Sequence, residues 1–164
     1  PPMLAIITNR LITAGQTLSL TVVGSDADVP VQSLTYSLAS APFGVALGAS
    51  SGMLTWTPTL APATNTITVV VADNGTPSLT ATQSFTVVIA PLPALGSYAY
   101  SGNQFSFSWA THAGQRFQVE FKDDLNEPNW FPLGGEIIGT GGTLSFTNVL
   151  DEEPQRFFRL RVLP

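Results

Sequence analysis

The stretch NTITVVVADNGTPSLTATQSFTVVIA (Asn65–Ala90) predicts two β-strands joined by a turn. On both sides of its centre, residues of strand-forming types alternate with polar ones, which is the pattern of strands with one buried face. At the centre, Asn74-Gly75 accepts the positive φ that a tight turn needs, and Pro77 stops the incoming strand. We therefore expect a β-hairpin in which Asp73 is a turn residue.

Short runs with the same alternation occur throughout residues 1–91. In QTLSLTVVG, for example, Leu18, Leu20 and Val22 share one face and polar residues share the other. Gly, Pro, Asn or Asp bounds each run, and no segment has the i, i+3, i+4 apolar spacing of an amphipathic helix. About seven short strands with turns between them indicate an antiparallel β-sandwich.

The segment IAPLPALG (Ile89–Gly96) divides the chain, because two prolines so close together make a short, stiff linker. Beyond it, NQFSFSWA and RFQVEFKDD alternate in the same way, with Phe105, Phe107 and Trp109 on one face of the first. About five or six such runs predict a second, smaller sandwich. The expected fold is therefore all-β, with domains over residues 1–91 and 92–164.

Composition excludes several classes of protein. The 164 residues are 44 % hydrophobic and 10 % charged, with a net charge of −5. The few basic residues are scattered and form no stripe for phosphates, so no nucleic-acid binding is expected. No apolar run reaches the roughly 18 residues of a membrane span, so no membrane insertion is expected. Cysteine is absent, which excludes disulfides and thiolate zinc. Because Pro1-Pro2-Met3 begins without a signal peptide, we expect a fragment of a longer protein.

Residues 3–90 resemble the bacterial putative-Ig and cadherin-like (dystroglycan-type) repeats. The motifs that carry the resemblance are GMLTWTPT, which includes Gly52–Pro58, and VADNGTPSL (Val71–Leu79). Two departures from the pattern are Ala14, where the family often has glutamate, and an acidic run reduced to Asp26 and Asp28. The resemblance implies an immunoglobulin-like β-sandwich.

The second half is similar to fibronectin-III-like modules, on the segments FSWATHAGQRFQVEFKDDLNEPNWFPLGG and QRFFRLRVLP. A fibronectin-III domain has one more strand after RFFRLRV, so the resemblance implies a shortened module or one that lacks its last strand. By resemblance, both halves are noncatalytic modules of multidomain exported bacterial proteins, either secreted or at the cell surface. Such proteins include adhesins and polysaccharide-degrading enzymes.

A calcium site is one interpretation of the acidic residues. Asp26 and Asp28 are two positions apart and can turn the same way in an extended loop. An EF-hand loop is excluded, because Pro30 occupies its fifth position and no glycine follows. The family resemblance makes Asp73 a third ligand if it converges with the other two. The alternative is that these side chains only accept hydrogen bonds from backbone N–H groups in turns. No other cofactor is expected.

A carbohydrate site is a second interpretation, since sugars stack on exposed aromatic rings. Alternation leaves five aromatic side chains outside the expected core: Trp130, Phe131, Phe157, Tyr98 and Tyr100. Together they would form a solvent-exposed patch. The alternative is that Phe157 and the two tyrosines fill the joint between the domains or pack under a missing strand.

Catalysis is not expected. The single histidine, His112, lies in a turn-like THAGQ segment, and nothing nearby would hold it beside an activated serine. The acidic groups at 123–124 and 151–153 lie in hydrophilic turns, where solvated carboxylates are the norm. If the strands pair as in fibronectin-III sheets, Glu120 approaches Arg159 or Arg161, and an exposed pair of this kind contributes at most about 1 kcal/mol.

The expected function is that of a noncatalytic spacer and interaction module in an exported multidomain protein. One alternative is a carbohydrate-binding module appended to a secreted glycoside hydrolase. Another is an adhesin segment stiffened by calcium. The partners would be a polysaccharide, a cell-surface protein or the flanking domains of the parent chain.

Overall fold

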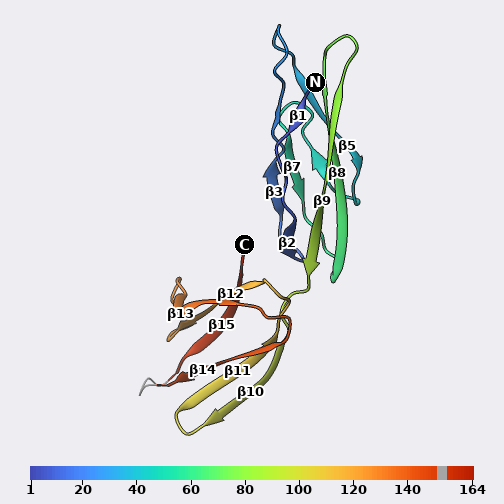
Figure 1. The fold of residues 1–164 in the computed structure, drawn as a ribbon. Coiled ribbons are helices and arrows are strands. Elements are labelled where there is room, and N and C mark those ends of the chain that lie inside the picture. Colours follow the sequence, from blue (N-terminus) through green and yellow to red (C-terminus); the bar gives the residue numbers. More distant parts are fainter. Residues whose placement is uncertain (151–154) are drawn as a thin grey trace. The chain divides into compact units, whose positions relative to one another are not determined.

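The computed structural model describes residues 1–150 and 155–164, and every regular element in them is a β-strand. Because these residues contain no helix, none of their elements is a helix that could cross a bilayer. The chain forms two compact units, Pro1–Ala90 and Pro91–Pro164 (Figure 1). The all-β prediction, with two immunoglobulin-like sandwiches in tandem, is confirmed.

The first unit has nine strands in three sheets, two more strands than expected because short pieces such as β1 and β4 pair separately. The sheet orders are β2-β9-β8-β5, β3-β7-β6 and β1-β4. The strands are β1 (Met3–Leu4), β2 (Arg10–Thr13), β3 (Leu18–Thr21), β4 (Gly24–Ser25), β5 (Leu34–Ser40), β6 (Ala46–Leu47), β7 (Met53–Trp56), β8 (Ala63–Asp73) and β9 (Thr80–Ala90).

The hairpin β8–β9 is the centre of this unit. Its strands pair antiparallel from Ala63–Ile89 to Ala72–Thr80, so the predicted hairpin is confirmed. Its inward residues Ile67, Val69, Phe85, Val87 and Ile89 are almost fully buried. They form one core cluster with residues from β3 and β7 and the residue after β3: Leu18, Leu54, Trp56 and Val22. One pairing differs from the antiparallel expectation, since β2 lies parallel to β9.

The predicted tight turn at Asn74-Gly75 is wrong. No non-glycine residue in the described part of the chain has a positive φ, and Gly75 is not among the glycines that do. The connection instead spans residues 74–79. Asp73 Oδ1 accepts hydrogen bonds from the N–H groups of Gly75 (3.1 Å) and Leu79 (2.8 Å), and its carbonyl accepts one from Ser78 Oγ (2.7 Å). These side-chain bonds close a longer loop that needs no positive φ.

The second unit is a sandwich of two three-stranded sheets, with orders β10-β11-β14 and β13-β12-β15. Its core is aromatic: Trp109 is fully buried and meets Phe117 edge-on, with ring centroids 5.9 Å apart. The strands are β10 (Leu95–Ser101), β11 (Gln104–Ala110), β12 (Arg116–Lys122), β13 (Phe131–Ile138), β14 (Thr143–Val149) and β15 (Phe157–Leu163).

The expected ion pair on the outer face of this unit is present. Glu120 lies opposite Arg159 in the β12–β15 register. Its Oε2 accepts a hydrogen bond from Arg159 Nε at 2.6 Å, and its Oε1 lies 3.3 Å from Arg161 Nη1. The carboxylate differs from the expected exposed pair, because Glu120 is only 4 % exposed, whereas the Arg159 and Arg161 side chains are 44 % and 57 % exposed.

Because its carboxylate is buried, we expect Glu120→Gln to lower the free energy of unfolding by about 1.5 kcal/mol, the low end for hydrogen bonds to charged groups. Chemical denaturation measures this change. The matched control is Glu136→Gln, whose partner Arg116 is half exposed. An equal loss in both variants would contradict the role given to burial. The hydrogen bond from Arg116 lowers the pKa of Glu136. The Arg116–Glu136 pair therefore stabilises the fold at neutral pH, and this stabilisation is lost as the pH falls through the lowered pKa of Glu136.

Candidate metal centre

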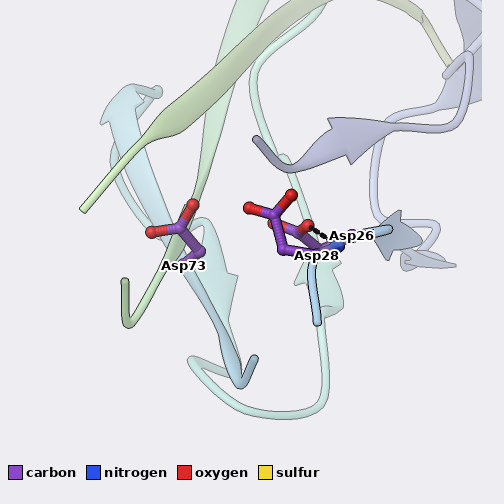
Figure 2. A group of neighbouring side chains, drawn as sticks. All are labelled: Asp26, Asp28 and Asp73. Atoms are coloured by element: carbon purple, nitrogen blue, oxygen red, sulfur yellow. Dashed lines mark hydrogen bonds between the residues drawn. The ribbon is translucent and has the colours of Figure 1, made fainter. Parts of the chain in front are cut away.

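Three aspartates from two distant parts of the sequence converge at one end of the first unit. Carboxylate oxygens of Asp26, Asp28 and Asp73 all lie within 4.8 Å of one another (Figure 2). The strand register brings them together: Asp26 follows β4, Asp73 ends β8, and Leu34, the first residue of β5, pairs with Asp73. The loop at 26–33 therefore returns to the end of β8, which meets the condition that the sequence set for Asp73.

Two of the carboxylates also serve turns, as the alternative interpretation expected. Asp26 Oδ1 accepts a hydrogen bond from the backbone N–H of Asp28 at 2.8 Å (Figure 2). Asp73 Oδ1 accepts the two bonds that close the β8–β9 loop. In each case the bonds involve Oδ1. The turn role and a ligand role are therefore compatible in the same side chain.

The site also contains buried acceptors without donors. Three buried side-chain polar atoms of the described residues have no hydrogen-bond partner, and two of them, Asp26 Oδ2 and Gln32 Oε1, belong to the loop at 26–33. A Cβ placed on Gly75 would lie 3.2 Å from both Gln32 Oε1 and Asp73 Oδ1, so the Gln32 amide lies against the hairpin loop. Buried acceptors left unpaired are costly, and a bound cation would satisfy them.

The electrostatics of the cluster favour a cation. Three carboxylates that each place an oxygen within 4.8 Å of the others gather negative charge that a cation between them would offset.

The donor set selects the kind of ion. All candidate ligands are oxygens, three of them carboxylates, which suits a hard cation and excludes a thiolate or imidazole metal site. Asp26 and Asp28 lie in a loop and Asp73 lies at the end of β8, so the carboxylates do not form a preset octahedral cage. Calcium accepts six to eight oxygens in flexible geometry, whereas magnesium keeps several waters. The donors present would suit calcium, with Asp26, Asp28 and Asp73 as the carboxylates that would hold it and the Gln32 amide beside Asp73.

Comparison with protein families identifies the domain that the first unit forms. A family model described as "Putative Ig domain" matches residues 1–90, more than half of the chain. The chain belongs to this Putative Ig domain family. A comparison with curated proteins found no match. The family match covers all three aspartates and both loops of the candidate centre.

Solved structures similar to this Putative Ig domain chain include cadherin repeats. Extracellular cadherin domains 3–6 of protocadherin gamma B2 are 16 % identical, with a TM-score of 0.50, and 98 % of this chain aligns with 48 % of that one. The protocadherin gamma B7 EC3-6 cis-dimer structure is 15 % identical, with a TM-score of 0.50, and 97 % of this chain aligns with 47 % of that one. Mouse cadherin-23 EC22-24 is 17 % identical, with a TM-score of 0.47, and 98 % of this chain aligns with 64 % of that one. The chain thus spans about half the length of the two protocadherin structures, and the likeness concerns the fold.

The five aromatic residues predicted for carbohydrate do not form one patch. Tyr98 and Tyr100 lie opposite Phe107 and Phe105 in the β10–β11 register, on the inner face of their sheet. Phe157 lies opposite Lys122, on the outer face of the other sheet. The two groups therefore lie on different faces of different sheets.

The remaining two aromatics are not an open platform either. Trp130 is half-buried, and its ring lies 4.9 Å from Lys122 Nζ and 4.5 Å from Arg159 Cζ. Phe131 is 48 % exposed and packs on Phe121, with centroids 6.1 Å apart. The cations over Trp130 occupy ring surface that a sugar would need. Carbohydrate binding remains a prediction without an assembled site.

His112 and Asp123, two of the groups weighed for catalysis, make local structural contacts. The backbone N–H of His112 donates to Gln115 Oε1 at 2.8 Å, and its Nδ1 lies 3.1 Å from the Ala113 carbonyl, as in the turn that the sequence predicted. Asp123 pairs with Arg156 at 2.7 Å. The acidic run at 151–153 lies outside the described residues.

Gln32 is the residue of the candidate centre that sequence reasoning missed. It closes the segment GSDADVPVQ, and its side-chain amide offers an oxygen only six positions after Asp26. That spacing was a usable signal, but an amide is far less specific for calcium than a carboxylate.

Proposed function

We propose that this chain is a noncatalytic interaction module of an exported protein, and that calcium orders one end of its first unit. The observation that supports the proposal is the convergence of Asp26, Asp28 and Asp73 beside two buried acceptors that lack donors. Membership of an Ig-domain family supports the interaction role. The partner is a cell-surface protein or a flanking domain of the parent chain.

The ion's contribution would be mechanical. It would join the loop at 26–33 to the end of the central hairpin, where Ser33 N–H already donates a 2.9 Å hydrogen bond to Asn74 Oδ1. Fixing both loops reduces the conformational entropy that they would lose on meeting a partner. Carbohydrate binding is the weaker proposal, because its aromatic side chains are divided between two sheets.

Melting with and without calcium tests the proposal. At a free calcium concentration 100 times the Kd, we expect the first unit to be stabilised by about 2.7 kcal/mol. For a unit of this size, that corresponds to a rise in Tm of roughly 10–20 °C over the sample in EDTA. Differential scanning calorimetry measures the shift, with sodium chloride used to match ionic strength.

The control variant is Asp28→Asn, which removes one carboxylate that accepts no backbone hydrogen bond in the structure. We expect this variant to melt like the wild type in EDTA and to lose most of the calcium response. A wild-type Tm that calcium leaves unchanged would refute the calcium centre. An equal response in Asp28→Asn would refute the assignment to these residues.

A further inference from the structure

A pocket opens in the first unit where β7 ends and β8 begins. It has a volume of about 470 Å³, and residues of both main sheets and of the connections at 42–44 and 57–60 line it. The strands contribute Trp56 of β7, Ala63 and Asn65 of β8, and Ile89 of β9. A concave site of this size and mixed lining is typical of pockets that bind small ligands.

The connection at 42–44 holds an aromatic ring in solvent at this pocket. The indole N–H of Trp56 donates a hydrogen bond to the carbonyl of Phe43 at 3.1 Å. Gly44 follows with a φ of +88° and turns the backbone beside the same indole. These features fix the backbone at Phe43, while its side chain is fully exposed. The ring of Phe43 is therefore a fixed apolar surface that a ligand can cover.

One amide side chain lies on the inner side of β8 at this pocket. Asn65 is two residues before Ile67, the first of the buried series of β8, so both share one face of the strand. Asn65 is half-buried and lines the pocket. Among the described residues, its side-chain amide has no hydrogen-bond partner. An amide offers two donors and one acceptor, and here all three are available to a ligand.

The lining of the pocket selects against charged ligands. None of the residues that line it is acidic or basic. The only lysine or arginine of residues 1–90 is Arg10, whose guanidinium donates a hydrogen bond to Thr8 outside the lining. A charged ligand would therefore lose water without gaining an ionic partner, which costs free energy. The pocket fits a neutral ligand that has both an apolar face and hydrogen-bonding groups.

We propose that the first unit binds a neutral pyranose sugar in this pocket, stacked on Phe43 and hydrogen-bonded by Asn65. A sugar ring offers C–H groups on its face and hydroxyls at its edge, which match these two side chains. Proline-rich peptides also bind aromatic grooves, but the Trp56 N–H that would bond a peptide carbonyl is already used within the fold. The pocket shares no residue with the candidate calcium centre or with the five aromatics predicted for carbohydrate, so each of these sites can fail alone.

NMR titration of the whole chain in EDTA tests the proposal. The ligands are three neutral trisaccharides (cellotriose, maltotriose and mannotriose), the anionic trisaccharide trigalacturonate, and octaproline. We expect at least one neutral sugar to bind at least about tenfold more tightly than trigalacturonate and octaproline. The largest shift changes should occur at Phe43, Asn65 and the Trp56 indole. No binding of any neutral sugar up to about 10 mM, shift changes confined to other residues, or tighter binding of octaproline would overturn the proposal.

Two pairs of protein variants complete the test. Phe43→Ala removes the stacking surface and Asn65→Ala the amide, and we expect each to weaken the sugar at least about fivefold. The matched controls are Tyr98→Ala, an exposed aromatic of the second unit, and Thr64→Ala, an exposed residue on the other face of β8. Both controls should bind as the wild type does. Calorimetry checks that all four variants fold. Equal weakening by Tyr98→Ala or Thr64→Ala would overturn the proposal, as would full binding by Phe43→Ala and Asn65→Ala.

Discussion

Replacing Trp109 with alanine is expected to destabilise the second unit by about 3–5 kcal/mol, the range for removing a buried tryptophan. Trp109 has no exposed surface, and its ring lies 5.5 Å from that of Phe107 and 5.9 Å from that of Phe117. The substitution removes the largest fully buried side chain of the chain's described part and leaves a cavity between two aromatic neighbours. A small domain has few residues that can collapse into it.

Calorimetry of the whole chain measures this effect and separates the two units. We expect Trp109→Ala to lower the Tm of one transition strongly and to leave the transition of residues 1–90 in place. Phe131→Ala is the control, because Phe131 is half exposed and should cost much less. A loss below about 1 kcal/mol for Trp109→Ala would show that this side chain is not central to the core.

Replacing Asp73 with alanine is expected to cost at least about 3 kcal/mol in the first unit, even without calcium. The carboxylate is 6 % exposed and accepts hydrogen bonds from the N–H groups of Gly75 and Leu79. Each bond to a charged group contributes about 1.5–3 kcal/mol, and alanine leaves both donors without their acceptor. Chemical denaturation in EDTA measures this loss.

Asp73→Asn separates the turn role of this residue from its ligand role. Asparagine keeps an oxygen where Oδ1 lies, so we expect most of the stability in EDTA to remain while the calcium response falls. If Asp73→Asn cost as much stability as Asp73→Ala in EDTA, the negative charge rather than the acceptor would be holding the loop. If Asp73→Asn kept the full calcium response, Asp73 would be a turn residue only.

The strands were predictable because alternation has a local cause. From Ile67 to Asp73 in β8 and from Phe85 to Ile89 in β9 every second residue is buried, so the sequence itself carries the pattern of the fold. The turn between β8 and β9 was not predictable in this way, because Asn74-Gly75 favours a tight turn only when no other hydrogen bond competes with it. Here the buried Asp73 carboxylate draws in the N–H of Leu79, six residues away, and the loop follows that bond.

The candidate centre could be predicted only in part. Asp26 and Asp28 are close in sequence, but their distance from Asp73 depends on the pairing of Leu34 with Asp73, which no local pattern determines. Tyr98 and Tyr100 show the same limit. Their spacing of two residues puts them on one face of a strand, but whether that face is inner or outer depends on their pairing with Phe107 and Phe105.

Direct titration of the whole chain with calcium tests the central claim most closely. By isothermal titration calorimetry at neutral pH, the structure predicts one saturable site per chain that prefers calcium to magnesium. Asp26→Asn replaces the carboxylate whose Oδ2 has no hydrogen-bond partner with a neutral amide, and it should reduce the affinity for calcium at least about tenfold. No saturable binding up to about 10 mM calcium, beyond the range of extracellular calcium modules, would contradict the account. So would binding that Asp26→Asn leaves unchanged.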